Sequence, residues 1–333
     1  MTPRTSRRKG SPDVGTRPCR RCPSRPTLTA YHLRGRPLLS FRQCVAATML
    51  IVAAACGDSN GPGSDPGPGR LAFTRAGNSL EDIYAVALRG SNLQQLTTSL
   101  ALDDWVAWSP DTTRILFQSD TAADTSSVHF HVFIMNSDGS HRAQLTFDTA
   151  SYHPAWSPDG ARIVFGSKRD DVNGDIYTMD PNGSNVLRIT TNTAADGQPA
   201  WAPNGNRIAF ATDRDANAEV YVMDPDGANP INLTNDPSTD LAPAWSPDGS
   251  KIAFQSDRLG DFAVWVMNAD GSNPVRLTDP SPPSGAPSWS PDGTRIAYEQ
   301  GGDIWIMNVD GSRKIRITSG FWADGLPRWR PIL

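Results

Sequence analysis

The sequence predicts an all-β protein whose main domain is a six-bladed β-propeller closed by its C-terminal strand. A tripeptide similar to Trp-Ser-Pro recurs six times at intervals of 40 to 48 residues, a period typical of propeller blades. Short β-branched and aromatic runs, separated by turn residues, follow the copies. The array also begins with a second strand that no Trp strand precedes, and it ends with a Trp strand that no second strand follows. The tryptophans of the tripeptide are Trp108, Trp156, Trp201, Trp245, Trp289 and Trp329.

One unit shows how the residues of a blade specify its elements. Residues 157–160, Ser-Pro-Asp-Gly, place Pro where φ is preset and Gly where φ must be positive, which predicts a tight hairpin turn. Residues 162–165 and 175–179 are apolar runs that predict strands covered by neighbouring blades. Residues 180–183 predict the next hairpin, and residues 188–190 end the outer strand. The recurring Trp is expected to pack between blades, because an aromatic at a fixed repeat position fills the same core slot each time.

The two ends of the array lack complementary strands. The second strand of a blade begins at Arg70, Arg114, Arg162, Arg207, Lys251 and Arg295. The first copy has no Trp strand before it, and the last Trp strand, residues 326–331, has no partner after it. We therefore expect the C-terminal strand to complete the first blade and close the ring, which removes the free sheet edges.

The full pattern resembles a known family. The units read Pro-x-Trp-Ser-Pro-Asp-Gly, Arg-Ile-Ala-Phe, Asp-Ile-Tyr-x-Met-Asp and Asp-Gly-Ser-Asn, and they are similar to the TolB-like β-propeller repeats, the WD40-like family of periplasmic proteins. The resemblance covers residues 70–331. TolB carries an α/β domain before its propeller, and the segment between Cys56 and Arg70 has no room for one, so a variant without that domain is expected. Related propellers occur beside peptidase domains and in oligogalacturonate lyases.

The N-terminal residues 1–55 are predicted to be a basic extension and a signal peptide. They carry eleven Lys or Arg residues and one acid, and their apolar run ends in three alanines directly before Cys56. This pattern resembles a bacterial lipobox, with Ala53 where Leu is usual, and predicts that Cys56 is lipidated; a secretory signal cleaved after Ala-x-Ala is the alternative. Residues 56–69 are Gly/Pro-rich and predict a flexible tether before the propeller, residues 70–333. The expected location is the cell envelope, lipid-anchored and facing the periplasm or the cell surface.

Charge and cysteine content narrow the class of partner. From Cys56 onward the chain has 20 basic and 34 acidic residues, a net charge of −14, which disfavours a nucleic-acid partner. All four cysteines lie at or before Cys56, so the repeat region cannot form a disulfide. Cys19 and Cys22 would supply only two of the four ligands that a zinc site needs, so we interpret their spacing as incidental. We expect a monomer without metal or cofactor, attached to a membrane through its lipid alone.

Candidate binding residues are expected on one face of the propeller. In an up-and-down blade, the Ser-Pro-Asp-Gly and Asp-x-Asp-Gly turns share one face, and the loops between second and third strands share the other with the blade-to-blade connections. The second face varies between units, which predicts that it is the recognition face. The candidates there are Asp103, Asp196, Asp240 and Asp324, each five residues before a repeat Trp, together with Trp105, His153 and Trp322.

These candidates have structural alternatives. The four aspartates form an acidic ring able to hold a cation or a basic peptide, or each caps backbone N–H groups of its own loop. Trp322, beside Phe321 and outside the repeat slots, is expected to be an exposed contact residue. Recurring arginines are expected to form loop-ordering ion pairs with neighbouring acids. These arginines are Arg169, Arg214 and Arg258, with Asp170, Asp213 and Asp257 as the neighbours.

Metal binding is a further alternative. Four of the five histidines, His129, His131, His141 and His153, fall in the second unit or at the start of the third. The first two flank Phe130 at strand spacing and point to one face, whereas His141 lies in a turn on the opposite face, so a site using all four is not expected. Residues 171–175 weakly resemble a calcium loop but lack its last glutamate.

The sequence favours a non-catalytic binding propeller that recognises an envelope protein or a small ligand. Its repeat region, residues 70–333, contains no Gly-x-Ser-x-Gly nucleophile elbow. One alternative is a propeller enzyme that resembles oligogalacturonate lyase and binds a divalent metal through His129 or His153. The other is a TolB-like component of an envelope-integrity system such as Tol–Pal.

Overall fold

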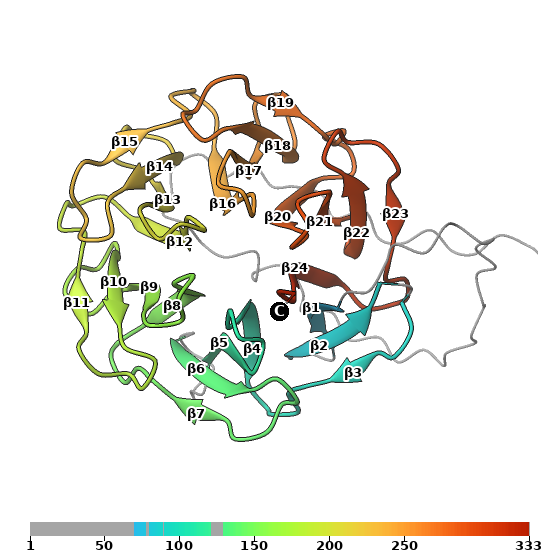
Figure 1. Cartoon of the computed structure of the whole chain (residues 1–333), viewed down its shortest axis with the longest axis horizontal. Helices are drawn as coiled ribbons and strands as arrows, with labels where there is room; N and C mark the ends of the chain where they lie inside the picture. Colours follow the sequence, from blue (N-terminus) through green and yellow to red (C-terminus); the bar gives the residue numbers. More distant parts are fainter. Residues whose placement is uncertain (1–69, 78–79, 89, 121–128, 333) are drawn as a thin grey trace, which may run out of the picture. The chain divides into compact units, whose positions relative to one another are not determined.

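The computed structural model describes residues 70–77, 80–88, 90–120 and 129–332 (Figure 1). The chain divides into two units between Leu50 and Ile51, and all of the described residues belong to the second unit. They form six four-stranded antiparallel sheets, β1 to β24, and each sheet is one blade. In the described part of the chain, no helix has the length and hydropathy needed to cross a bilayer. The predicted signal peptide, the tether and Cys56 lie outside the described residues.

The strands of each blade follow the chain from the inside of the ring to the outside, except in blade 1, which takes its innermost strand from the C-terminus (Figure 1). Blade 1 consists of β24 (Asp324–Trp329), β1 (Arg70–Ala76), β2 (Glu81–Ala87) and β3 (Gln94–Gln95). Blade 2 consists of β4 (Leu102–Trp108), β5 (Arg114–Asp120), β6 (Phe130–Asn136) and β7 (Ala143–Gln144). Blade 3 consists of β8 (Ser151–Trp156), β9 (Ile163–Ser167), β10 (Asp175–Met179) and β11 (Leu187–Arg188). 

The last three blades repeat this order. Blade 4 consists of β12 (Asp196–Trp201), β13 (Ile208–Thr212), β14 (Glu219–Met223) and β15 (Ile231–Asn232). Blade 5 consists of β16 (Asp240–Trp245), β17 (Lys251–Ser256), β18 (Ala263–Asn268) and β19 (Val275–Arg276). Blade 6 consists of β20 (Ser284–Trp289), β21 (Arg295–Gln300), β22 (Asp303–Asn308) and β23 (Ile315–Arg316).

The last strand closes the ring. β24 pairs antiparallel with β1, and Trp329 lies opposite Leu71 in the register. The backbone N–H of Arg330 donates to the carbonyl oxygen of Arg70 over 2.9 Å and extends this pairing. The predicted completion of the first blade by the C-terminal strand is therefore confirmed, and the fold is a six-bladed propeller. Closure pairs the inner edge of β1, which would otherwise be the unpaired inner edge of the first blade.

The hairpin turns share one side of the ring, which we call the turn face. In blade 3 the N–H of Gly160 donates to the carbonyl oxygen of Ser157 over 2.9 Å, and Gly160 has a φ of 71°. The Ser157 hydroxyl donates to Asp159 over 2.6 Å and accepts the N–H of Arg162 over 2.8 Å. Side chain and backbone thus hold the same turn. The loops between second and third strands and the blade-to-blade connections emerge on the opposite side, the loop face.

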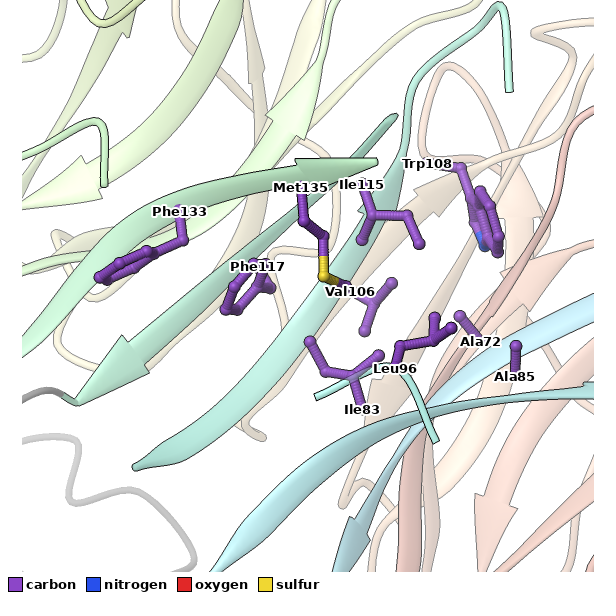
Figure 2. Close-up of a cluster of buried hydrophobic side chains, with 10 residues drawn as sticks. All are labelled: Ala72, Ile83, Ala85, Leu96, Val106, Trp108, Ile115, Phe117, Phe133 and Met135. Carbon is purple, nitrogen blue, oxygen red and sulfur yellow. The ribbon is translucent and has the colours of Figure 1, made fainter. Parts of the chain in front are cut away.

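Most of the core is divided into six clusters between neighbouring blades, and a repeat Trp belongs to each of these six or packs against it. Figure 2 shows the cluster between blades 1 and 2, where Trp108 of β4 packs with Ala72, Ala85 and Leu96 of blade 1. Trp329 packs in the same way between blades 6 and 1. The predicted packing role of the repeat Trp is confirmed, because its large ring fills one interface after another.

Candidate functional site

Each innermost strand contains a β-bulge. The pairing register with the second strand shifts at the bulge in every blade, for example between Asp104 and Ala107 of β4. The residue three positions before each repeat Trp has a positive φ of 50–54°, although none is Gly. Such a conformation costs on the order of 1–3 kcal/mol and persists where the surroundings impose it. These residues are Trp105, His153, Gln198, Ala242, Ala286 and Leu326.

Hydrogen bonds link these bulges from blade to blade. In each case the backbone N–H of a bulge donates to a side chain of the preceding blade. The acceptor is Gln118 for His153 (2.8 Å), His153 for Gln198 (3.3 Å), Gln198 for Ala242 (2.8 Å) and Gln255 for Ala286 (3.0 Å). These contacts place the bulges side by side around the propeller axis. They also satisfy backbone groups that the register shifts leave without a strand partner.

Trp105 and His153, two of the predicted binding residues, are in contact. Their ring centroids lie 4.1 Å apart, and the Tyr152 ring meets His153 edge-on at 4.9 Å. His153 accepts the N–H of Gln198 at Nδ1, so its own ring proton resides on Nε2. Burial, and then the positive charge of Arg328, lower the pKa of His153 to about 3, so the imidazole is neutral at pH 7. The predicted residues thus form an aromatic pair with ring N–H donors at His153 Nε2 and Trp105 Nε1.

Glu299 of β21 makes the corresponding blade-to-blade contact at the closing strand. Its carboxylate accepts the backbone N–H of Leu326 in the bulge of β24. A Cβ at Gly325 would lie 2.7 Å from Glu299 Oε2, so the glycine allows this approach. Burial, followed by the charges of Glu81 and Asp324, raises the pKa of Glu299 to about 7. Gln118 and Gln255 fill the same position in two other blades with a neutral amide.

We expect Glu299→Gln to remove a pH dependence of stability. Because the pKa of about 7 in the folded protein exceeds the ordinary value of 4.5, the folded state binds the proton more tightly than the unfolded state. The resulting stabilisation is present below pH 4.5 and is lost as pH rises through 7, by up to about 1.4 kcal/mol per pH unit. Urea unfolding of both proteins between pH 4.5 and 8 measures the difference. Gln255→Glu should introduce a similar slope; equal slopes in all three proteins would contradict this account.

The four predicted aspartates lie at the loop-face ends of the innermost strands and are at most 2% exposed. Their partners are arginine side chains, so they neither line an open acidic ring nor depend on the backbone of their own loops. Each arginine also lies over two aromatic rings; Arg75, for example, lies 5.4 Å from the ring centroid of Phe73 and 5.0 Å from that of Tyr84. The pairs are Arg142–Asp103 (3.1 Å), Arg214–Asp196 (3.2 Å), Arg258–Asp240 (2.7 Å) and Arg75–Asp324 (2.6 Å).

The ion pairs predicted for the recurring arginines are confirmed, but their partners differ from the expected neighbours. Arg169 pairs with Asp148 over 2.8 Å, and the other two pair with the buried aspartates described above. The expected neighbours bind other groups. Asp170 accepts the hydroxyl of Tyr177, Asp213 accepts the N–H of Ala195, and Asp257 accepts the N–H of Thr239.

The histidines do not converge on one point. His131 Nδ1 lies 3.9 Å from Asp148, whereas His141 is exposed in a hairpin turn and contacts Ser140. Across residues 70–332, apart from the undescribed gaps, no group of three His, Cys, Asp or Glu side chains is arranged to hold a metal ion. In the segment that resembles a calcium loop, Asp171 accepts the N–H of Asn173, a local turn.

The loop face carries the most exposed large apolar side chains of the described residues. Leu100 is 92% exposed, Phe321 85%, and Phe147 and Val172 79% each. Three of them lie in blade-to-blade connections, and Val172 lies between β9 and β10. Trp322 is 39% exposed, as predicted, and its ring meets that of Phe321 edge-on at 5.4 Å. Exposed apolar side chains in the loops of one face are candidates for an interaction surface.

Sequence reasoning missed several of these residues. Leu100 and Phe147 are single apolar residues in polar connections, which carry no pattern. Arg328 could have been found by comparing the repeats position by position. The residue before the repeat Trp is small in five blades and Arg328 in blade 1. The small residues are Ala107, Ala155, Ala200, Ala244 and Ser288.

Comparison with known proteins supports the repeat assignment. The family model of the TolB beta propeller domain matches residues 132–230 and 194–281, and that of the dipeptidyl peptidase IV N-terminal region matches residues 260–329. A Protein TolB homolog from Chlorobium luteolum is 28% identical over 126 residues. That match covers 38% of this chain and 27% of the relative, so it spans about a quarter of the relative's length.

Solved structures share the fold at low sequence identity. TolB from Acinetobacter baumannii has a TM-score of 0.69 and 22% identity, covering 79% of this chain and 67% of that one. Hydrazine synthase from Kuenenia stuttgartiensis has a TM-score of 0.65 and 16% identity, covering 79% of this chain and 47% of that one. The motif matches, the repeat register and the closed six-bladed ring agree with one another. The described residues therefore form a TolB-like β-propeller.

Proposed function

We propose that this protein is a non-catalytic binding propeller of the cell envelope, tethered to a membrane through a lipid on Cys56. It binds an envelope protein or a ligand through its loop face. The observation that carries the proposal is that the four most exposed large apolar side chains of the described residues all lie on that face. The TolB-like repeats support the envelope location. The mass of the mature N-terminal peptide tests the anchor: a terminus other than lipidated Cys56 would remove the anchor from the proposal.

A TolB-like role in an envelope-integrity system is a second candidate, and the family match favours it. Both candidates require a binding face, and they differ in the partner. If the second candidate holds, loss of the protein should make the envelope leak periplasmic proteins. Unchanged envelope integrity combined with retained partner binding would favour the first candidate alone.

We expect the loop-face variant Phe147→Ser, Phe321→Ser, Trp322→Ser to lose its partner. Removing three exposed apolar anchors from a contact should weaken retention by about tenfold or more, the factor that corresponds to about 1.4 kcal/mol. The measurement is quantitative capture from envelope extract of the source organism, with the full chain as bait. The residues changed are exposed, so the fold should be unaffected.

A matched control removes apolar surface elsewhere. Leu187→Ser, Ile231→Ser and Val275→Ser change side chains that are 58%, 48% and 56% exposed on the outermost strands of blades 3, 4 and 5. This control should retain the partner at the level of the natural chain. Equal retention by the loop-face variant and the natural chain would show that the recognition face has been misplaced.

A further inference from the structure

Three of the residues that depart from the repeat around the axis lie together. Arg328 stands where the other blades have Ala or Ser, and Trp105 and His153 stand where blades 5 and 6 have Ala242 and Ala286. The Arg328 guanidinium carbon lies 5.1 Å from the centroid of the Trp105 ring, and the Trp105 and His153 centroids lie 4.1 Å apart. Three side chains from three consecutive blades, on the inner strands β24, β4 and β8, are thus in contact in sequence, with the Trp105 and His153 rings tilted by 50°.

Arg328 differs from the arginines of the loop face in its charge environment. Each of those arginines is paired with an aspartate, whereas Arg328 has no carboxylate partner among the described residues. Its guanidinium donates to the carbonyl oxygen of Pro327 over 2.9 Å, which leaves most of its five N–H donors for another acceptor. Burial lowers its pKa to about 10, so it remains charged at pH 7. A half-buried cation without a counter-charge is costly, and an incoming anion would relieve that cost.

The neighbours of Arg328 add a donor and an orienting surface. The neutral His153 accepts from Gln198 at Nδ1, so its Nε2 carries the ring proton and is a hydrogen-bond donor. The Trp105 ring lies against the guanidinium and restricts its orientation. The three side chains therefore offer a planar cation and N–H donors. An acceptor with negative charge is the complementary chemistry.

We propose that Arg328, Trp105 and His153 bind a carboxylate group at the axis of the propeller. The proposal rests on the binding function above and names the chemistry of the group that enters the site. One planar guanidinium matches one carboxylate in charge and in geometry. A phosphate dianion would bring a second negative charge toward a body with a net charge of −14 and find one cation. The carboxylate is supplied by a protein, at its C-terminus or a side chain, or by a free organic acid.

The test is a titration of the full chain with acetate, monitored by calorimetry and by the NMR signals of His153. The variant His153→Gln lacks these signals and therefore assigns them. We expect acetate to bind and to raise the pKa of His153, because a nearby anion favours the imidazolium. Arg328→Ala, which gives blade 1 the residue found in blades 2 to 5, should weaken acetate binding by about tenfold or more, as expected for a charged hydrogen-bonded pair. Arg313→Ala, an exposed arginine on the turn face, is the matched control and should leave binding unchanged.

Further probes separate the sources of the carboxylate. Trialanine with a free C-terminus should bind, and its amidated form should not, if the site receives a chain end; acetate binding without trialanine binding indicates a small organic acid. Equal acetate binding by Arg328→Ala and the natural chain, or inorganic phosphate binding more tightly than acetate, would overturn the proposal. Loss of partner by the loop-face variant together with unchanged acetate binding by Arg328→Ala would leave the proposed function standing and refute this inference alone. Weakened acetate binding by Arg328→Ala, together with unchanged partner retention by the loop-face variant, would support this inference and refute the proposed function.

Discussion

Deletion of residues 326–333 is expected to abolish the cooperative unfolding transition of the propeller. The deletion removes most of β24 and with it Trp329, which packs between blades 6 and 1. It also exposes the inner edge of β1, a row of unpaired backbone groups that invites aggregation. Thermal unfolding followed by circular dichroism, with size-exclusion chromatography, measures the effect. The deleted protein should elute as aggregate or show no transition.

A shorter deletion provides the control. Removing residues 332 and 333 leaves β24 and its pairing with β1 intact, so the transition should remain close to that of the natural chain. If the longer deletion yielded a monomer with an unchanged midpoint, closure by the C-terminal strand would not stabilise the ring.

Asp324→Ala is expected to destabilise the folded protein by about 3–5 kcal/mol, the cost of leaving a buried charge unpaired. Arg75 binds both carboxylate oxygens of Asp324, over 2.6 and 2.8 Å, and its own side chain is 17% exposed. The substitution leaves this guanidinium between two aromatic rings without its counter-charge. Urea unfolding at pH 7 gives the change in the free energy of unfolding.

A variant that lacks both members of the pair separates the effect of an unpaired charge on stability from the effect of the lost contact. The double variant Arg75→Met, Asp324→Leu should be more stable than Asp324→Ala, since it leaves no unpaired charge and fills a similar volume. Asp261→Ala, at an exposed position of the loop face, should change stability by less than about 0.5 kcal/mol. A double variant that is less stable than the single one would contradict the charge explanation.

The fold could be predicted from the sequence because its signals are local and repeated. The Ser-Pro-Asp-Gly turns, the strand runs and the recurring Trp each specify one element within one blade. The offset between the six Trp strands and the six second strands then predicts how the ends meet, and the pairing of Trp329 with Leu71 confirms it.

The candidate site was less predictable because its contacts are not local. Arg75 and Asp324 are 249 positions apart, and the buried state of the aspartate follows from ring closure. The bulges place Trp105 and Leu326 at positive φ, against the preference of both residues, through contacts between blades. Trp322 and the position of the loop face were predictable, since both depend on departures from the repeat.

Hydrogen exchange of the full chain, alone and with its captured partner, tests the central claim that the loop face is the recognition face. The partner should slow exchange in the blade-to-blade connections that carry the exposed apolar side chains, residues 97–101, 146–150 and 318–323. Exchange in the turns at residues 157–160, 246–249 and 290–293 should be unchanged. Protection of those turns, with no effect on the connections, would contradict the claim.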